Sequence, residues 1–392
     1  MSFIDFFLVL ATLLGASLEY YDYMLFNLML PIISPVFIGS SGFSGLTSGY
    51  LVNFLSSILR PLGAFCFGYI GDKYGRRSAL FLSMALMSIS SLVISFLPGY
   101  GAIGFLAPII LFFCRILQVM SAAGELNGSA IFLIETFEAN GNKRFGFASG
   151  LAWFFTVLGM LGGAFASYKL GEGNWRQGFL VGAFIGVFAL ALRLLPKKKV
   201  VKLEECSSDK LWINFICVTL IAAGISGMFY YNMIFFFGHL QILFDATLVR
   251  KFSVYAFALY AFALLFFGIL SDSLKSPFKS MFLGSFLMAV IAIPSIYFKS
   301  LYLHFLNVFI LAAYVGPSHR ILYLLFPPKY RYRGISVAFG IGTSLIGSLT
   351  TLACSYYIQR FPLFPGFWLI FVSSLGFCGS YLGSKIISKN IS

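Results

Sequence analysis

The sequence is organised around Gly68-Tyr69-Ile70-Gly71-Asp72-Lys73-Tyr74-Gly75-Arg76-Arg77, a short charged stretch between two long apolar runs. The run 46–69 before it contains a single charged residue, and the run 78–97 after it contains none. Basic residues in a tight gap that is rich in glycine are typical of a loop at a membrane surface. An ordinary loop that has merely collected Lys and Arg is the alternative interpretation.

A weaker copy of this stretch lies 200 positions further along the chain, at 268–275, with Asp272 in the place of Asp72. A second echo pairs Tyr20-Tyr21-Asp22 with Tyr230-Tyr231-Asn232. The two echoes together indicate that the chain contains its own half twice. Two parallel halves with a substrate site between them at mid-membrane are one of the transporter architectures.

The composition excludes a water-soluble protein. Charged residues make up 10% of the 392 residues, apolar residues make up 59%, and the mean hydropathy is +0.92. A soluble domain carries about 25% charged residues. At roughly 20 apolar residues per span, the chain accommodates about 12 membrane-crossing helices. The first apolar run lacks a basic start and continues into structure, so we expect no cleavable signal peptide.

The hydropathy pattern predicts an all-α polytopic membrane protein with 12 transmembrane helices in two six-helix halves. One connection is both long and polar, and it divides six spans from six. We therefore expect an N-terminal bundle over 1–195, a cytoplasmic linker over 196–210 and a C-terminal bundle over 211–392. The predicted spans lie near 6–33, 46–71, 78–98, 103–127, 146–169, 175–195, 211–238, 250–270, 279–298, 301–324, 334–358 and 364–386.

The distribution of basic residues predicts the orientation. If the N-terminus is cytoplasmic, 18 of the 27 Lys and Arg residues lie on the inner side, 6 on the outer side and three within spans. This asymmetry places both termini inside. The net charge of +14 does not indicate nucleic-acid binding, because the charges sit in short loops. The six cysteines have no metal or disulfide spacing, and we expect them to be apolar fillers.

At this point the sequence resembles the major facilitator superfamily, whose hallmark loop between the second and third spans is matched by residues 71–77. Finer features resemble one branch, the metabolite:H+ symporters, which include proline/betaine, citrate, 2-oxoglutarate and shikimate carriers. The matching motifs are Glu19-Tyr20-Tyr21-Asp22-Tyr23, Arg60-Pro61-Leu62-Gly63, Arg115 with Gln118, Gly124-Glu125, Glu135 and Trp175-Arg176. In the second half the match is thinner, with Leu324 and Phe339-Gly340 where the branch has other residues.

The carboxylates within the spans are the candidates for proton coupling. A charged group at bilayer depth costs at least about 2.5 kcal/mol, so it is a functional candidate by default. Glu19 and Asp22 are three positions apart and share one helix face. Two carboxylates this close in a low dielectric cannot both ionise easily, which suits a proton carrier. The alternative is a structural pairing with Arg60 or Arg115. Glu125 is a second proton-site candidate.

The substrate candidates are the buried arginines and a set of aromatic and amide side chains. The guanidinium groups of Arg60 and Arg115 suit a carboxylate, although either could instead be a counter-ion for a buried acid. In the second half we expect Tyr230, Tyr231 and Asn232 to line the cavity. Tyr20 and Gln118 are added because they lie in the motifs that carry the resemblance. We expect His239, His304 and His319 at surfaces or interfaces, and we predict no metal site.

The resemblance also implies a conformational lock that holds the inner ends of the halves together. Its residues are Gly71, Asp72, Gly75, Arg76 and Arg77, with Glu135 as an acidic partner. Ser276-Pro277 replaces the paired arginines in the second copy, so we expect an asymmetric lock.

The sequence therefore predicts a secondary active transporter and not an enzyme. We expect proton-coupled uptake of a small carboxylate-bearing metabolite, such as an amino acid, a betaine or an organic acid, by a monomer in the bacterial inner membrane. The proton gradient is the driving force, and we predict no cofactor. A proton-driven exporter of the same fold is the alternative. A membrane-embedded enzyme would need a nucleophile–base set or a metal cluster in the spans, and the sequence shows neither.

Overall fold

The computed structural model describes residues 3–74, 76–122, 125–192, 211–274, 276–298 and 300–391, and over these ranges it contains helices, turns and short connections but no strand. The first half comprises α1 (Phe3–Phe37), α2 (Gly42–Ser57), α3 (Arg60–Tyr74), α4 (Arg76–Phe96), α5 (Tyr100–Ile103), α6 (Leu106–Ser121), α7 (Glu125–Ala139), α8 (Phe145–Leu170) and α9 (Trp175–Leu192). The second half comprises α10 (Leu211–Phe229), η1 (Tyr230–Phe235), α11 (Phe236–Leu243), α12 (Ala246–Ser273), α13 (Pro277–Phe298), α14 (Leu301–Val315), α15 (Ser318–Leu325), α16 (Pro328–Gly342), η2 (Thr343–Gly347), α17 (Ser348–Tyr357) and α18 (Phe364–Ile391).

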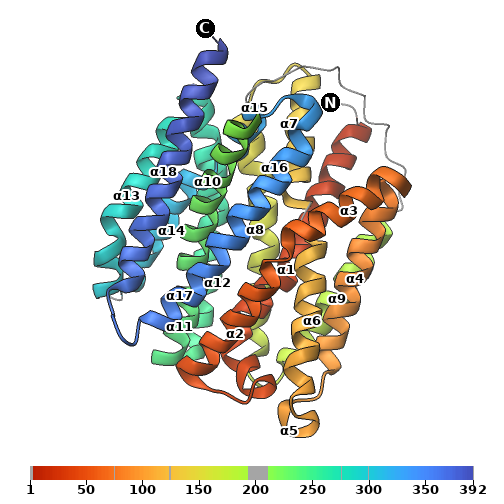
Figure 1. Ribbon diagram of the computed structural model, residues 1–392, viewed down its shortest axis with the longest axis vertical. Coiled ribbons are helices and arrows are strands. Elements are labelled where there is room, and N and C mark those ends of the chain that lie inside the picture. The colour runs from red at the N-terminus through yellow and green to blue at the C-terminus, as the bar shows by residue number, and fades with distance from the viewer. Residues whose placement is uncertain are drawn as a thin grey trace.

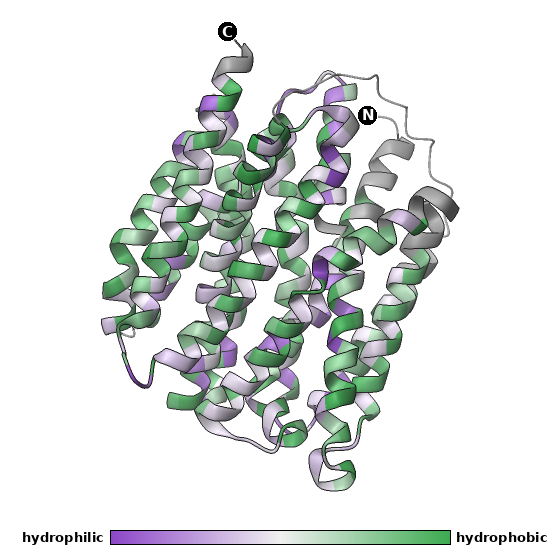
Figure 2. Ribbon diagram, in the orientation of Figure 1, coloured by the Kyte–Doolittle hydropathy of each residue, from purple (hydrophilic) through white to green (hydrophobic). Residues whose placement is uncertain are grey.

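The helices have the length and polarity of membrane spans. Eight of the described helical segments are long and apolar enough to cross a membrane, and the shorter apolar helices Phe81–Phe96 and Leu106–Ser121 accompany them. Large apolar side chains are exposed on the surface of the bundle. Phe65, for example, is 71% exposed and Trp212 is 80% exposed. Apolar positions run along most of each helix in Figure 2. An exposed apolar coat is stable only against lipid. The prediction of an all-α polytopic membrane fold is confirmed.

Consecutive helices combine into single crossings. α2 joins α3, α6 joins α7, α14 joins α15, and a π-helical turn links the pieces of the crossings formed by α10–η1–α11 and α16–η2–α17. With these combinations the order of elements is consistent with twelve crossings. The second crossing breaks before Pro61, which lacks a backbone N–H and is best accommodated in the first turn of a helix.

The two halves stand side by side, and both chain termini emerge at one end of the bundle, uppermost in Figure 1. We call this the terminal end and the opposite end, which carries α5 and α11, the distal end. The expected boundaries between the halves fall at 195/196 and 210/211. Residues 193–210 lie outside the described residues, so the division at these positions remains a prediction.

Two predicted spans are too short. The fourth was expected to end near residue 127, but α7 continues to Ala139. Its last turns carry Glu135 and Glu138, whose carboxylates contact the other half, so acidic residues that look like a loop belong to the end of a helix. The seventh was expected to end near residue 238, but α11 continues to Leu243.

Asn232 lies within the π-helical turn η1 and supports it. Its Nδ2 donates a hydrogen bond of 2.8 Å to the backbone oxygen of Met228, four residues earlier. A π-turn disturbs the regular i→i−4 ladder, and a side-chain donor can satisfy a carbonyl that the ladder leaves available. π-Turns often occur at functional sites, and Tyr230, the first residue of η1, lines the central cavity described below.

Glycines bring the halves together where α8 packs against α12. A Cβ atom at Gly150 would lie 2.7 Å from the backbone oxygen of Leu264. A Cβ at Gly268 would lie 2.6 Å from the backbone oxygen of Gly146. No side chain fits at these positions without a shift of backbone, so the two helices touch through their main chains.

Candidate functional site

A cavity of about 40 Å³ lies between the two halves. Aromatic rings dominate its wall, and Arg60 is the charged residue among them. It is lined by Tyr20, Tyr23, Arg60, Trp153, Val157, Met160, Ile225, Ser226, Phe229, Tyr230, Tyr260, Phe339 and Thr343. A water molecule needs roughly 10–15 Å³ in this measure, so the cavity has room for only a few waters. The space at the centre of the molecule is therefore small.

A second cavity of about 10 Å³ lies inside the first half and shares three lining residues with the central one. Its wall brings together several of the sequence candidates. It is lined by Glu19, Tyr20, Tyr23, Arg60, Met87, Arg115, Gln118, Val119 and Ala122. Arg60 and Tyr20 therefore face both the buried acid Glu19 and the space between the halves.

Asp22 is the acceptor at the centre of a buried polar network. Its Oδ2 accepts hydrogen bonds from the Ser91 hydroxyl and, at 3.2 Å, from Gln118 Nε2. Gln118 Nε2 also lies 2.9 Å from Ser91 Oγ. The other oxygen, Oδ1, has no hydrogen-bond partner in the protein. It faces Gly182 of α9, where an added Cβ would lie 2.1 Å from it.

Arg115 belongs to the same network but does not line the central cavity. Its guanidinium donates to Gln118 Oε1 at 2.8 Å and to Asn53 Oδ1 at 2.9 Å. It also lies 3.9 Å above the ring of Phe26. Gln118 thus stands between Arg115 and Asp22. Of the two arginine candidates, the structure places Arg60 at the central cavity and Arg115 one layer behind it.

The candidate residues of the second half do not all lie at the central cavity. Tyr230 lines the central cavity, and its ring centroid lies 6.2 Å from that of Tyr23 in the first half. Tyr231 and Asn232 are fully buried but do not line this cavity. Asn232 instead reaches Met288 of α13 at 3.8 Å. The duplicated Tyr-Tyr motif therefore provides one cavity residue in the second half.

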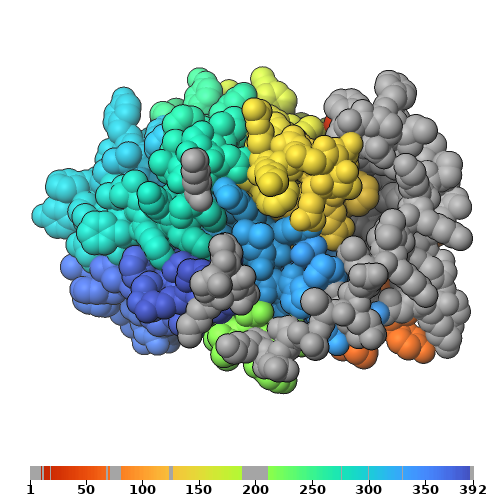
Figure 3. Space-filling view, turned by 90° about the horizontal axis from the view of Figure 1, so that it is seen from above, coloured from red at the N-terminus to blue at the C-terminus, as the bar shows by residue number. Residues whose placement is uncertain are grey.

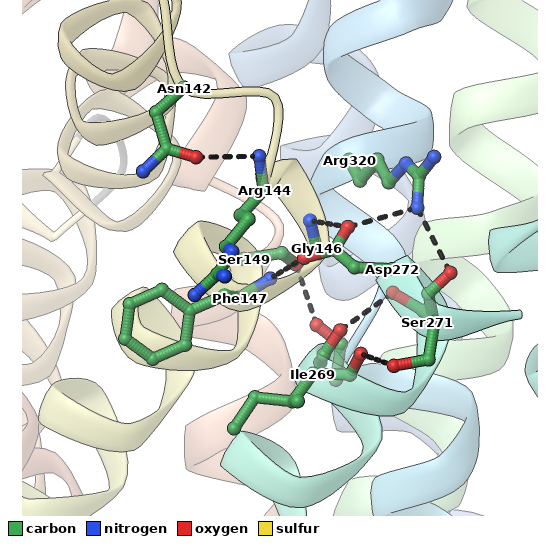
Figure 4. Close-up of polar contacts among 12 residues, drawn as sticks. Asn142, Arg144, Gly146, Phe147, Ser149, Ile269, Ser271, Asp272 and Arg320 are labelled. Atoms are coloured by element: carbon green, nitrogen blue, oxygen red, sulfur yellow. Dashed lines mark hydrogen bonds and ion pairs between the residues drawn. The ribbon is translucent and has the colours of Figure 1, made fainter. Parts of the chain in front are cut away.

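The terminal end is closed by polar contacts between the halves. Asp272, the counterpart of Asp72, accepts hydrogen bonds of 2.8 Å from the backbone N–H groups of Gly146 and Phe147 at the start of α8 (Figure 4). Arg320 of α15 donates to Asp272 Oδ1 at 3.1 Å. A carboxylate at a helix N-terminus is stabilised by the unpaired N–H groups and the helix dipole. We call these contacts the Asp272 latch.

A second set of contacts lies beside the latch. Glu135 Oε1 is 3.6 Å from Arg331 Nη1, and the Tyr323 hydroxyl donates to Glu138 Oε2 at 2.5 Å. The guanidinium of Arg331 covers the Tyr323 ring at 3.7 Å. Seen from the terminal end, α7 and α8 (yellow) touch α12 (teal) and α16 (blue) without an opening between them (Figure 3).

Aromatic and small polar residues join the halves between the latch and the cavity. Trp153 Nε1 donates to Ser318 Oγ at 3.0 Å, and Ser149 Oγ donates to the backbone oxygen of Gly316 at 2.6 Å. The ring of His319 packs against Trp153 at a tilt of 41°, with ring centroids 4.9 Å apart, and its Nε2 lies 3.3 Å from Asn127 Oδ1. His319 is thus a buried interface residue between the halves.

The distal end is also closed, by fewer polar contacts. Thr47 Oγ1 lies 2.7 Å from Ser355 Oγ, which connects α2 to α17. Gln241 Nε2 of α11 donates to the backbone oxygen of Leu28 at 3.2 Å, and the Tyr50 hydroxyl donates to that of Ile234 at 3.2 Å. In the described residues, hydrogen bonds therefore join the two halves at both ends.

Several predicted site residues are not described by the structure, wholly or in their side chains. Gly75 lies outside the described residues. The structure also describes neither the surroundings of Gly71 nor the side chains of Asp72, Arg76, Arg77 and Glu125. Their roles stay predictions. Glu135 does contact the opposite half, with Arg331 as a partner.

Sequence reasoning missed the cross-half partners of the latch, Gly146 and Phe147. One signal could have found them, because Gly146 and Gly150 form a G-x-x-x-G pattern at the start of the fifth predicted span. Combined with the second-copy acid Asp272, this pattern points to a close helix contact at the same membrane surface. Ser91 and Glu138 gave no comparable signal.

A two-half helical bundle with a polar and aromatic cavity between its halves is the architecture of a membrane transporter. The sequence pattern of the Major Facilitator Superfamily matches residues 12–351. The chain belongs to this superfamily, and it is a transport protein and not an enzyme.

Curated relatives and solved structures agree with this assignment. The chain is 28% identical to the putative proline/betaine transporter of Staphylococcus aureus strain COL, over 94% of the chain and 86% of the relative. It is 27% identical to the proline/betaine transporter of Escherichia coli K12, over 94% and 81%. The crystal structure of a D-xylose-proton symporter aligns with a TM-score of 0.72 at 14% identity, covering 97% of each chain, which supports the fold alone.

Proposed function

We propose that the protein is a proton-coupled symporter that imports a small zwitterion carrying a carboxylate and a quaternary or secondary ammonium group. The observation that carries this proposal is the wall of the central cavity. It combines one guanidinium, Arg60, with seven aromatic side chains: Tyr20, Tyr23, Trp153, Phe229, Tyr230, Tyr260 and Phe339. A guanidinium suits a carboxylate, and aromatic faces attract an ammonium group that has few N–H donors.

The names of the relatives support the same substrate class, since proline and betaine are both zwitterions of this kind. The rings come from both halves, so the ammonium group would be enclosed only when the halves approach each other. A substrate of this size does not fit the cavity of about 40 Å³. Binding therefore requires the halves to open and then close around the substrate.

Proton coupling is assigned to the buried acids next to this cavity. Glu19 lines the cavity of the first half together with Arg60, and Asp22 lies three residues further along α1. A proton taken up by an acid in this region alters the charge facing Arg60 and Arg115. Charge at this depth is costly unless it is compensated, so protonation and substrate binding are expected to depend on each other. Glu125 remains the second candidate.

The terminal end is assigned to the cytoplasm because most Lys and Arg residues of the predicted loops lie on that side. The Asp272 latch would then close the carrier towards the cytoplasm and release when substrate is delivered. We propose a monomer in the bacterial inner membrane with both termini inside, driven by the proton gradient without a cofactor.

Uptake into proteoliposomes tests the proposal. Purified protein is given labelled glycine betaine, proline or succinate, with and without a proton gradient directed inward. We expect accumulation of the zwitterions only with the gradient, and its loss in Arg60→Gln. Arg176→Gln is the matched control, because Arg176 binds the backbone oxygens of Ser95 and Leu97 at the distal end, away from the cavity.

Each part of the proposed function would be contradicted by a different result. Accumulation that is indifferent to the gradient would refute proton coupling. Transport of succinate alone would refute the zwitterion. Net movement of substrate against an inward flow of protons would identify an exporter.

A further inference from the structure

Two polar side chains on α14 are buried without hydrogen-bond partners in the protein. His304 is 2% exposed, and neither of its ring nitrogens has a partner. Asn307 is fully buried, and neither its amide oxygen nor its amide nitrogen has a partner. His304 was expected at a surface or an interface, and it lies at a buried interface within the second half, between α14 and α11. Neither residue lines the two cavities described above.

The ring of His304 fixes how α14 lies against the seventh crossing. It stacks on Phe236 at 3.9 Å with an interplanar angle of 3°, and it meets the edge of Phe237 at 4.9 Å. The seventh crossing runs towards the distal end, and α14 runs away from it. Asn307 follows His304 by three residues on α14, and Asn232 precedes Phe236 by four residues on the seventh crossing. These two steps cover similar distances along antiparallel helices, so Asn307 lies at the depth of Asn232.

A third buried polar side chain with an atom that lacks a hydrogen-bond partner, Asn232, lies at this depth. Its Nδ2 donates to the Met228 oxygen and reaches Met288 Sδ on α13, which packs against α14. Its Oδ1 has no partner in the protein. We call His304, Asn307 and Asn232 the α14 polar site. It lies on the side of η1 that faces α13 and α14, whereas Tyr230 at the start of η1 faces the central cavity.

The chemistry of these groups selects the ligand. A neutral imidazole offers one donor and one acceptor, the Asn307 amide offers both, and Asn232 Oδ1 is an acceptor. A bare cation would be repelled by the N–H donors, and an organic ligand would meet Phe236, Phe237 and Met288 at close range. Water both donates and accepts, and buried waters typically satisfy groups of this kind.

We propose that the α14 polar site binds ordered water inside the second half, between η1 and α14. This inference does not depend on the transported substrate. The water completes the hydrogen bonds next to the π-turn, where the backbone ladder is irregular. It would thus be a structural component of the helix that carries Tyr230.

Hydroxyl-radical footprinting of the intact protein tests the proposal, because X-ray radiolysis activates bound water and oxidises the side chains beside it. We expect Met288 to be oxidised faster than Met281, which is equally buried seven residues earlier on the same helix. In Asn307→Leu the excess labelling of Met288 should be lost, whereas Asn307→Ser, which keeps a donor and an acceptor, should retain it.

Thermal unfolding in detergent provides a second test. If water is bound, Asn307→Leu removes its partner and lowers the melting temperature. If the site is dry, the apolar and nearly isosteric leucine relieves an unsatisfied amide and raises the melting temperature. A rise in the melting temperature, or equal oxidation of Met288 and Met281, would overturn the proposal. A sodium-dependent rise that Asn307→Leu abolishes would also overturn it, in favour of a cation.

Discussion

The carboxyl group of Asp22 has two oxygens in different surroundings. Oδ2 accepts from Ser91 and Gln118, whereas Oδ1 faces the backbone of α9 at Gly182 and has no partner in the protein. The ionised form is thus stabilised at one oxygen and left unsatisfied at the other. Oδ1 is therefore the oxygen of Asp22 that no protein donor satisfies.

We predict that Asp22→Asn abolishes accumulation driven by the proton gradient and preserves exchange of substrate at equilibrium. The amide has the shape of the acid but cannot carry a proton. Net uptake and counterflow in proteoliposomes measure the two activities separately. Asp245→Asn, at the distal end of α12, is the control and should retain both. Gradient-driven uptake by Asp22→Asn would show that another acid carries the proton.

Gly182→Ala is predicted to impair the same step from the neighbouring helix. The added Cβ would lie 2.1 Å from Asp22 Oδ1, so the carboxyl group must shift, which disturbs its hydrogen bonds with Ser91 and Gln118. Overpacking of this kind costs about 1–3 kcal/mol, and about 1.4 kcal/mol of transition-state destabilisation is a tenfold loss of rate. We expect gradient-driven uptake to fall about tenfold or more.

Gly178→Ala is the matched control on the same face of α9. Its Cβ would meet the flexible end of Leu25 at 2.8 Å and would leave Asp22 untouched. Equal losses of uptake in the two variants would indicate a general packing defect of α9. Melting temperatures of both proteins identify such a defect independently.

Among the helices, the contact of α8 with α12 carries the closure of the terminal end. Main chains touch at Gly150 and Gly268, and Asp272 binds two N–H groups at the start of α8. Hydrogen bonds to a charged group contribute about 1.5–3 kcal/mol each. The Asp272 latch therefore biases the two-state equilibrium towards closure of this end.

Asp272→Ala is predicted to shift the carrier towards opening at the terminal end. A cysteine placed at Ser226 in the central cavity reports this opening, because a membrane-impermeant maleimide reaches it only through an open end. We expect labelling from the side of the terminal end to rise about tenfold or more, as the loss of two charge-assisted bonds implies.

Asp245→Ala is the control for this experiment. Asp245 caps the other end of α12, where its Oδ1 accepts from the Thr247 N–H at 2.9 Å, and this hydrogen bond stays within the second half. It should lower stability slightly without changing access to residue 226. Unchanged labelling in Asp272→Ala would show that the Asp272 latch does not hold the terminal end closed.

The elements differ in how far the sequence predicts them. Spans are set by long apolar runs, and the Asp272 echo is visible as a motif, so both could be predicted. The partners of Asp272 lie 126 and 125 positions away, and their proximity depends on the rotation of α8, which hydropathy does not specify. The π-turn at Tyr230–Phe235 leaves no hydropathy signal, so Tyr231 and Asn232 were expected at the cavity.

For the molecule as a whole, the two ends close by different means. The terminal end uses carboxylates, guanidinium groups and helix termini, whereas the hydrogen bonds described between the halves at the distal end, such as Thr47–Ser355 and Gln241–Leu28, are neutral. Neutral hydrogen bonds contribute about 0.5–1.5 kcal/mol each, less than charged ones. The distal end should therefore open more easily than the terminal end.

A disulfide across the distal end should stop transport. The oxygens of Thr47 and Ser355 are 2.7 Å apart, so cysteines at both positions lie within reach of a bond. We predict that Thr47→Cys with Ser355→Cys loses uptake on oxidation and recovers it on reduction. Each single variant, which cannot form this bond, should be insensitive to oxidation. Uptake by the oxidised double variant would mean that the distal end need not open there.

The small size of the central cavity also bears on leakage. A carrier that returns empty must not become a channel for protons, and a continuous chain of water across the membrane would provide one. The central cavity of about 40 Å³ has room for a few waters, which is too little for a chain of water that spans the membrane. In the proton-coupled carrier proposed above, so small a central cavity would limit leakage of the ion gradient between transport cycles.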